Sequence, residues 1–126
     1  MIDHISVGVR DLEIAERFYE RALARLGLTR LVTRAGSVGF GKTYPEFWIN
    51  LRPDMAEVAA DSGMHVCLRA RTIADVDAFH AAALAAGGRS ESAPGLRPHE
   101  RVTYYAAFVT DPDGNRIEAV TFPTDA

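Results

Sequence analysis

A chain of 126 residues, 48% of them hydrophobic and 25% charged, can bury the core of one compact domain but is too short for two large ones. A net charge of -3 with scattered arginines argues against nucleic-acid binding, and no apolar run reaches the roughly 18 residues that a membrane-spanning helix needs. The acidic start of the chain and its single cysteine, Cys67, predict a cytoplasmic protein without disulfide bonds.

The first half of the chain predicts one strand, one helix and three further strands. In Ile2–Val9 apolar residues alternate with polar ones, which is typical of a half-buried strand with His4 on its polar face. Asp11 can cap a helix that ends at Gly27, because apolar side chains recur between them every three or four residues. Three short β-like runs follow, at Leu28–Thr33, Ser37–Lys42 and Phe47–Arg52.

The second half predicts the same order of elements. Met64–Leu68 alternates in the same way, with His65 on its polar face. Thr72 and Asp75 form the start of a helix that ends before two glycines. The strands expected after this helix are Arg89–Ser92, Val102–Thr110 and Asn115–Phe122, the last two joined by the turn DPDG.

A polar loop is expected over Ala93–Glu100, between two of these strands. A loop of this length in a compact domain is more often functional than idle. Arg97 and His99 are therefore candidates to close over a substrate, although a loop that faces water is the simpler interpretation.

An internal repeat connects the two halves. Displacing the chain by 61 positions matches His4 to His65 and Phe18 to Phe79, without a gap. The sequence thus predicts two βαβββ modules, about 1–53 and 63–123, in a fold of the α+β class. A displacement of 68 positions matches the last strands of the two halves and aligns Asn50 with Glu118.

Three polar side chains are candidates for one site. Alternation places His4, His65 and Glu118 on the strand faces opposite the residues that pack on the helices. Two imidazoles and one carboxylate suit a divalent ion (Fe, Mn, Ni, Co or Zn) and leave coordination positions open for water or substrate. Each residue taken alone has a simpler interpretation, a hydrogen-bonded structural histidine or a solvated glutamate, but the duplicated positions and the shared face favour the metal site.

Four other residues are candidates for the lining of this cavity. Alternation turns either Tyr104 or Tyr105 inward, where a phenol can donate to a bound oxyanion or act as an acid, and it does not decide between them. Trp48 and Asn50 share a strand face and can form a wall beside the metal. The equally supported alternative is a core tryptophan and a solvated amide.

The duplicated βαβββ order, the histidine at the first strand of each half and the ending FVTDPDGNRIEAV resemble the vicinal oxygen chelate superfamily. That superfamily includes glyoxalase I, extradiol dioxygenases, methylmalonyl-CoA epimerase, fosfomycin-resistance transferases and bleomycin-binding proteins. The resemblance covers essentially the whole chain and implies a curved, partly open mixed sheet around a metal cavity. It also implies that His4, His65 and Glu118 are the metal ligands and that two chains pair as a homodimer.

One position departs from the family pattern. Glyoxalase I has a carboxylate on the last strand of its first module, where this chain has Asn50, and Glu46 lies out of register at the edge of that strand. This departure disfavours a standard glyoxalase I site with four protein ligands.

The resemblance implies a divalent-metal-dependent enzyme, a lyase, isomerase or dioxygenase, that acts on a small substrate through chelated vicinal oxygens, with Glu118 among its catalytic groups. The alternative from a different class is a metal-free binding protein, like the bleomycin-resistance proteins, that holds a planar ligand between Trp48 and the tyrosines. A purely structural dimer is a third interpretation. The substrate, the metal and the reaction stay open.

Overall fold

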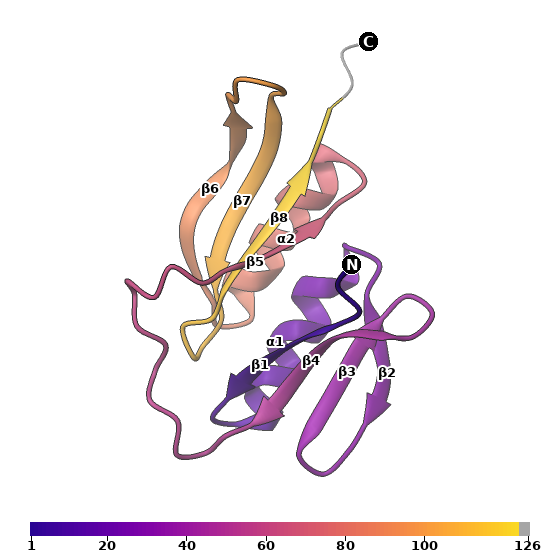
Figure 1. Cartoon of the computed structure of the whole chain (residues 1–126), viewed down its shortest axis with the longest axis vertical. Coiled ribbons are helices and arrows are strands. Elements are labelled where there is room, and N and C mark those ends of the chain that lie inside the picture. The colour runs from indigo at the N-terminus through magenta and orange to yellow at the C-terminus, as the bar shows by residue number, and fades with distance from the viewer. Residues whose placement is uncertain (124–126) are drawn as a thin grey trace.

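The structure is a computed structural model that describes residues 1–123. The first module consists of β1 (Ile5–Val9), α1 (Leu12–Ala24), β2 (Thr29–Thr33), β3 (Ser37–Gly41) and β4 (Pro45–Leu51). The second consists of β5 (Val66–Arg69), α2 (Ile73–Ala85), β6 (Arg89–Arg97), β7 (Tyr104–Thr110) and β8 (Arg116–Thr121). This repeated βαβββ order confirms the predicted α+β fold class (Figure 1).

Each module forms its own four-stranded mixed sheet. The strand orders are β1-β4-β3-β2 and β5-β8-β7-β6, and in both sheets the first strand runs parallel to its neighbour while the other pairs are antiparallel. A strand and the parallel strand beside it need a long crossover, which the helix and the two intervening strands supply. The two sheets therefore have equivalent edges, β1 in one and β5 in the other.

The helices begin where the sequence places their caps. The Asp11 carboxylate accepts a hydrogen bond from the backbone N–H of Ile14 (3.0 Å), and the Thr72 hydroxyl accepts one from that of Asp75 (3.1 Å). After α1 the chain reverses at Gly27, whose φ of 80° is a conformation that favours glycine. No helix between residues 1 and 123 is long and apolar enough to cross a membrane.

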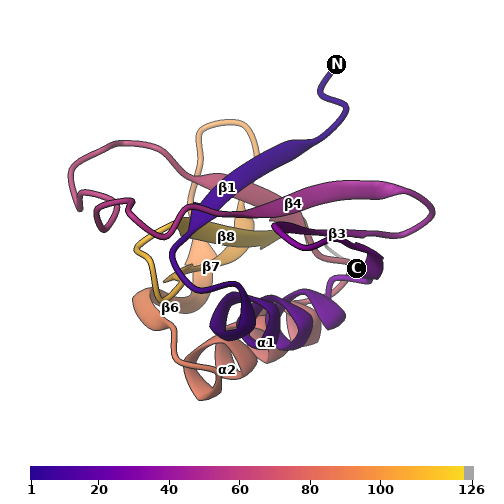
Figure 2. The same cartoon turned by 90° about the horizontal axis from the view of Figure 1, so that it is seen from below.

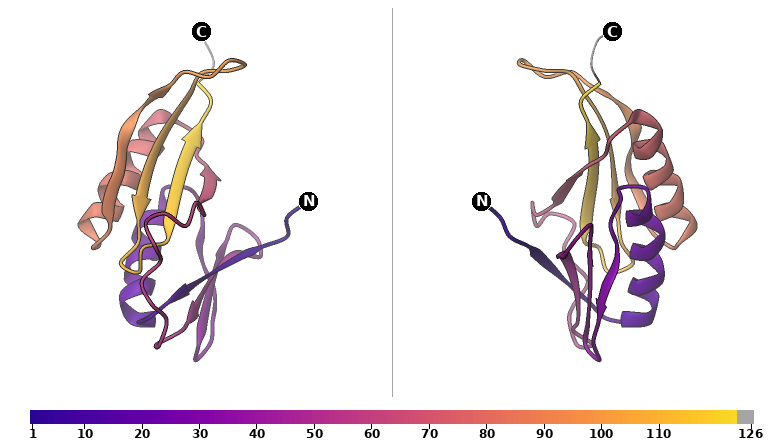
Figure 3. Two further views of the ribbon diagram at one scale, coloured as in Figure 1. Left: turned by 60° about the vertical axis from the view of Figure 1, so that its left-hand side comes forward. Right: turned by 90° about the vertical axis from the view of Figure 1, so that its right-hand side faces the viewer.

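Both helices cover the same side of the molecule and leave the other face of each sheet open (Figures 2 and 3). α1 and α2 also pack against each other, so the two modules share one hydrophobic core. The largest fully buried side chains are aromatic and come from both modules: Phe18, Tyr19, Phe40, Phe47 and Phe79. Polar side chains with a catalytic or binding role must accordingly lie on the open faces.

The turn DPDGN before β8 joins the two modules. The hydroxyl of Tyr19 in α1 donates to the buried carboxylate of Asp111 (2.6 Å), and the amide of Asn115 donates to a carbonyl of β1 (2.9 Å). The guanidinium of Arg10 donates to the buried Asp113 (2.8 Å). This turn is thus a structural junction, and Glu118 follows it directly on β8.

The strand β6 is longer than predicted. It continues to Arg97, so most of the loop expected over Ala93–Glu100 is strand, and the connection to β7 is short. Pro94 has no backbone N–H to donate, but β6 lies at the edge of its sheet, where no strand on the outer side needs that donor. Register shifts near Ser92 and Gly95 accommodate the irregular sequence. The prediction of a loop over Ala93–Glu100 was therefore wrong for Ala93–Arg97.

The strand register also corrects the alignment of Asn50 with Glu118. Ser6 of β1 lies opposite Trp48 of β4, whereas the repeat-equivalent Cys67 of β5 lies opposite Glu118 of β8. Trp48 is therefore the residue that corresponds to Glu118, and Asn50 is two positions further on. A shift by two keeps the same face, so Asn50 still points to the open side.

Candidate metal site

An imidazole and a carboxylate meet on the open face of the second sheet. Glu118 on β8 is only 6% exposed, and its Oε1 lies 3.1 Å from Nε2 of His65, the residue just before β5. The ring of Phe108 on β7, directly opposite Glu118, lies 5.4 Å from the His65 ring and supplies an apolar wall. A buried carboxylate requires a charge or hydrogen-bond partner, and His65 is one that the chain itself provides.

The spacing of these two donor atoms suits a common metal ion. Ligand atoms bound at about 2.0–2.2 Å in a tetrahedral or octahedral arrangement lie roughly 3.0–3.5 Å from one another. The separation of His65 Nε2 and Glu118 Oε1 falls in that range. The donor set, one neutral nitrogen and one carboxylate oxygen, also fits the divalent ions expected from the sequence.

His4, the third predicted ligand, lies apart from this pair. It precedes β1 as His65 precedes β5, so both predicted strand histidines lie just outside their strands. Its Nδ1–H donates to Asp3 (2.7 Å), which also lies 3.4 Å from the Tyr44 hydroxyl. A histidine ligand commonly donates its second ring N–H to a carboxylate in this way, and the Nε2 lone pair of a neutral His4 is then free.

One chain brings only two of the three predicted ligands together. His4 and His65 both line a cavity of about 470 Å³ between the edges of the two sheets, next to Met64 and Cys67. Among residues 1–123, however, no three histidine, cysteine, aspartate or glutamate side chains converge closely enough to hold an ion. Within one chain, His4 therefore lies outside the pair formed by His65 and Glu118.

Cys67 is a further residue of this site. The structure places it on the exposed side of β5, opposite Glu118. Burial of the sulfur atom, the negative charge of Glu118 and a hydrogen bond to that carboxylate raise the pKa of Cys67 to about 12. The thiol therefore stays protonated at neutral pH.

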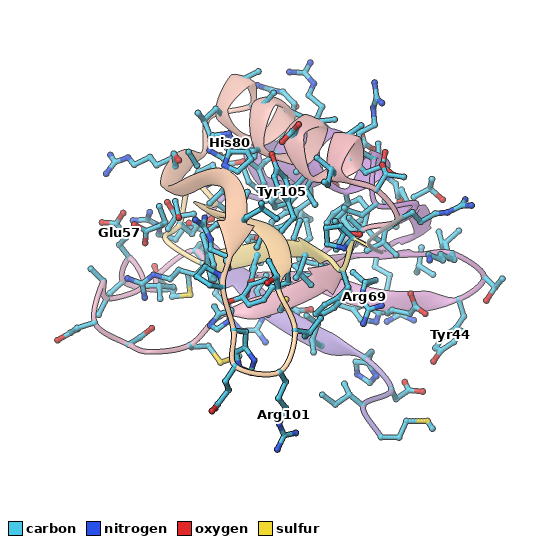
Figure 4. The ribbon with its side chains drawn as sticks, turned by 90° about the horizontal axis from the view of Figure 1, so that it is seen from above. Tyr44, Glu57, Arg69, His80, Arg101 and Tyr105 are labelled. Atoms are coloured by element: carbon cyan, nitrogen blue, oxygen red, sulfur yellow. The ribbon has the colours of Figure 1, made fainter. Side chains whose placement is uncertain are left out.

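The structure separates the two tyrosines that the sequence could not. Tyr105 lies beneath α2, where its hydroxyl donates to Asp77 (2.6 Å), on the helix side of the sheet (Figure 4). Its neighbour Tyr104 shares the face of Phe108 and Glu118 by strand alternation, and its ring lies 6.2 Å from that of Phe122. Of the two, Tyr104 is the one on the sheet face of Glu118, four residues along β7 from Phe108.

Trp48 and Asn50 line a second cavity, of about 400 Å³, on the open face of the first sheet together with His4. Arg34, from the turn between β2 and β3, adds a guanidinium to this cavity, with its Cζ 4.9 Å from the centre of a Trp48 ring. Sequence reasoning missed Arg34, because it lies outside the strands and no spacing connects it to Trp48.

Arg97 and His99 lie at the far end of the second sheet. The Arg97 guanidinium turns back on its own hairpin and donates to the Ser92 hydroxyl (2.5 Å) and the Ala93 carbonyl (2.8 Å). His99 accepts a hydrogen bond from the backbone of Arg101 and lies 6.4 Å, ring to ring, from Tyr104. The hairpin tip that carries Arg101 extends away from the helices, toward the open side (Figure 4).

Two βαβββ modules with a histidine–carboxylate pair on an open sheet face define a protein of the glyoxalase fold. The chain belongs to the Glyoxalase/Bleomycin resistance protein/Dioxygenase superfamily, whose family profile matches residues 1–119. The expected superfamily resemblance is thereby confirmed. No curated protein sequence matches the chain.

Solved structures of this family resemble the chain over nearly its full length. A glyoxalase/bleomycin resistance protein from Albidiferax ferrireducens T118 is 33% identical, with 94% of this chain and 96% of that chain covered and a TM-score of 0.83. The fosfomycin resistance protein FosX from Mesorhizobium loti is 20% identical, with coverages of 98% and 92% and a TM-score of 0.68. The bleomycin resistance determinant of transposon Tn5 is 20% identical, with coverages of 94% and 95% and a TM-score of 0.63. The last two similarities concern the fold alone.

Proposed function

We propose that this protein is a divalent-metal-dependent enzyme that acts on a small substrate through two adjacent oxygen atoms. The observation that supports the proposal best is the pair formed by His65 and Glu118, whose donor atoms lie 3.1 Å apart on the open sheet face. When bound, the ion supplies a Lewis acid for the oxygens of the substrate. The substrate is a small organic molecule, and the working location is the cytoplasm.

In this proposal the protein's own residues have separate tasks. His65 and Glu118 hold the ion, and Phe108 excludes water from one side of it. The Tyr104 phenol, on the same sheet face, donates a hydrogen bond to a substrate oxygen or acts as the acid. The Glu118 carboxylate would also be the group that accepts a proton from the substrate.

We further propose that the site is completed in a homodimer, with His4 supplied by the partner chain. Two features support this arrangement. His4 already donates Nδ1–H to Asp3, and exposed apolar side chains flank the second sheet, Met64 just before β5 and Phe122 just after β8. Pairing of the open sheet faces would bury these side chains and bring the first module of one chain against the second module of the other.

Metal content tests the proposed ligands. The variants Glu118→Gln, His65→Ala and His4→Ala should each bind less Zn²⁺, Mn²⁺ or Ni²⁺ per chain than the unaltered protein after metal is added to apoprotein, as measured by elemental analysis. Asp77→Asn, which alters an exposed carboxylate on α2, is the control. Unchanged metal content in Glu118→Gln would refute the site.

A mixing experiment tests whether ligands come from two chains. In a mixed dimer of His4→Ala and Glu118→Gln chains, a shared site leaves one intact set of ligands and one doubly altered set. Unfolding and refolding the two variants together should therefore restore part of the metal binding that each lacks alone. Failure to restore any metal, with mixed dimers demonstrated by mass spectrometry, would show that the site is not shared in this way.

A metal-free binding protein is the second candidate function. It is favoured by one specific observation, that His65 already forms a hydrogen bond with Glu118 without any ion. In this alternative the first-sheet cavity around Trp48 is the binding site. Full binding of a ligand by the apoprotein, with no metal taken up in the experiment above, would support it.

A further inference from the structure

The cavity on the first sheet contains a positively charged group that the proposed metal chemistry does not use. Its volume of about 400 Å³ is in the range of small-molecule sites. The lining includes Arg34, Ser37, Trp48 and Asn50, with His4 at one end. This cavity is therefore next to one proposed ligand and extends away from it along the sheet.

The Arg34 guanidinium is held in place by the tryptophan ring. Its Cζ lies 4.9 Å from the ring centre, which is the distance of a cation–π contact. The backbone of Arg34 is anchored as well, because its N–H donates to the carbonyl of Ser37 (2.8 Å) and closes the turn between β2 and β3. An arginine side chain held in this way loses little conformational entropy when it binds a ligand.

The Trp48 ring is itself fixed by close packing on the sheet. It lies across Gly39, where an added Cβ would come within 3.0 Å of the ring and within 2.8 Å of Pro45. Only a glycine at this position leaves room for the ring in its observed orientation. The ring is thus a rigid platform for the guanidinium.

No acidic side chain of residues 1–123 pairs with Arg34. Other arginines are paired, for example Arg10 with Asp113 and Arg30 with Glu16 and Glu20. The one carboxylate that lines the cavity, Asp3, is already bonded to His4. The positive charge of Arg34 is consequently available to a ligand.

We infer that Arg34, supported by Trp48 and flanked by Ser37 and Asn50, binds an oxyanion group of the substrate, so that the substrate is a small organic acid. Ser37 lies opposite Asn50 in the sheet, so a hydroxyl and an amide are neighbours on the same face. A planar guanidinium with two such groups beside it suits the two oxygens of a carboxylate, and a phosphonate offers the same chemistry. The inference rests on the proposed function where it calls this acid the substrate of the enzyme. Binding of the acid itself can be measured in the absence of metal.

Trp48 is the only tryptophan of the chain, so its fluorescence reports on this cavity directly. The apoprotein is titrated with benzoate, with its neutral analogue benzamide and with phenylphosphonate, and calorimetry checks each affinity. Benzoate or phenylphosphonate should bind at least about tenfold more tightly than benzamide, because a charge-assisted hydrogen bond is stronger than a neutral one. The tighter of the two anions identifies the acid class.

Variants assign that affinity to the guanidinium. Arg34→Gln should weaken binding of the preferred anion about tenfold or more, and Arg34→Lys should give an intermediate loss because it keeps the charge without the two-pronged geometry. Arg52→Gln is the matched control, since Arg52 is exposed near the end of the same sheet and lies outside this cavity. The inference would be overturned if neither benzoate nor phenylphosphonate bound more tightly than benzamide, or if Arg34→Gln left the affinity for the preferred anion unchanged.

Metal content, measured on the same samples, separates this inference from the proposed function. Arg34→Gln should bind as much metal as the unaltered protein. Glu118→Gln should keep its anion affinity in the absence of metal. Anion binding that depends on Arg34 in a protein that takes up no metal would support the inference while refuting the metal enzyme.

Discussion

Removing one hydroxyl from the core, in Tyr19→Phe, tests whether the DPDGN turn joins the modules as the structure indicates. The hydroxyl donates to Asp111 (2.6 Å), and both residues are buried. The substitution leaves the ring in its contacts with Phe18 and Phe47, whose ring centres lie 4.8 and 5.0 Å away. The change therefore isolates the hydrogen bond from the packing.

The expected cost follows from the environment of Asp111. A hydrogen bond to a charged group contributes about 1.5–3 kcal/mol, and the loss of a partner is most costly where water cannot replace it. The Asp111 carboxylate keeps three other hydrogen-bond donors, the backbone N–H groups of Asp113 and Asn115 and the Asn115 amide, so it stays partly satisfied in the variant. We expect a decrease of about 2 kcal/mol in the free energy of unfolding, or roughly 5–10 °C in Tm.

Tyr105→Phe is the matched control for this change. Its hydroxyl also donates to a carboxylate at 2.6 Å, that of Asp77, but at an exposed position. Water can replace the lost partner there, so we expect a loss below about 1 kcal/mol. Urea unfolding followed by circular dichroism measures both variants. Equal losses in the two would refute the reasoning that burial decides the cost.

The effect of Tyr19→Phe has a predicted pH dependence. Burial, the charge of Asp111 and the hydrogen bond to it raise the pKa of Tyr19 well above its usual value of 10.0. Below pH 10 the phenol is protonated in both the folded and the unfolded protein, and its contribution to stability is complete. Above that pH the unfolded protein loses the proton first, so stability falls as pH rises. The stability difference between the unaltered protein and Tyr19→Phe should therefore shrink above pH 10 and stay constant between pH 7 and 9.

Two further substitutions test local features of the fold by thermal unfolding. Gly88→Ala should cost about 2 kcal/mol or more of stability, because the new Cβ would lie 2.5 Å from Phe18 and 2.8 Å from the Thr110 carbonyl. Gly36→Ala is the control, and it should change stability by less than about 1 kcal/mol because nothing lies within 4 Å of the new Cβ. Similar losses in the two variants would contradict the packing around Gly88. Thr72→Ala should cost about 1 kcal/mol of stability through the loss of the α2 cap, whereas Thr72→Ser keeps the hydroxyl and should keep most of that stability. A Ser variant as unstable as the Ala variant would show that the hydroxyl is not the cap.

Local features of the fold were predictable because their causes are local. The caps Asp11 and Thr72 act on backbone groups three residues away, and alternation along a strand sorts side chains to two faces wherever one face is buried. The displacement of 61 positions that relates His4 to His65 is a property of the chain itself. These signals were sufficient for two βαβββ modules.

Pairing between distant strands was less predictable. The match of Asn50 to Glu118 was based on apolar neighbours that fit equally well after a shift by two, and only the hydrogen bonds of β4 with β1 show that Trp48 takes that position. The extension of β6 through Pro94 depended on the strand being at an edge, which the order of strands in space determines.

The sequence by itself determined the superfamily, the two modules and the placement of His65 and Glu118 on the same sheet face, because these follow from repetition and short-range periodicity. Only the tertiary structure decided that His65 and Glu118 meet while His4 remains apart, that Tyr104 rather than Tyr105 lies on the open sheet face, and that Arg34 stacks on Trp48. Distances between side chains on different strands depend on sheet register, twist and the packing of one module on the other. Those quantities arise from many distant contacts acting together, and no spacing along the chain encodes them.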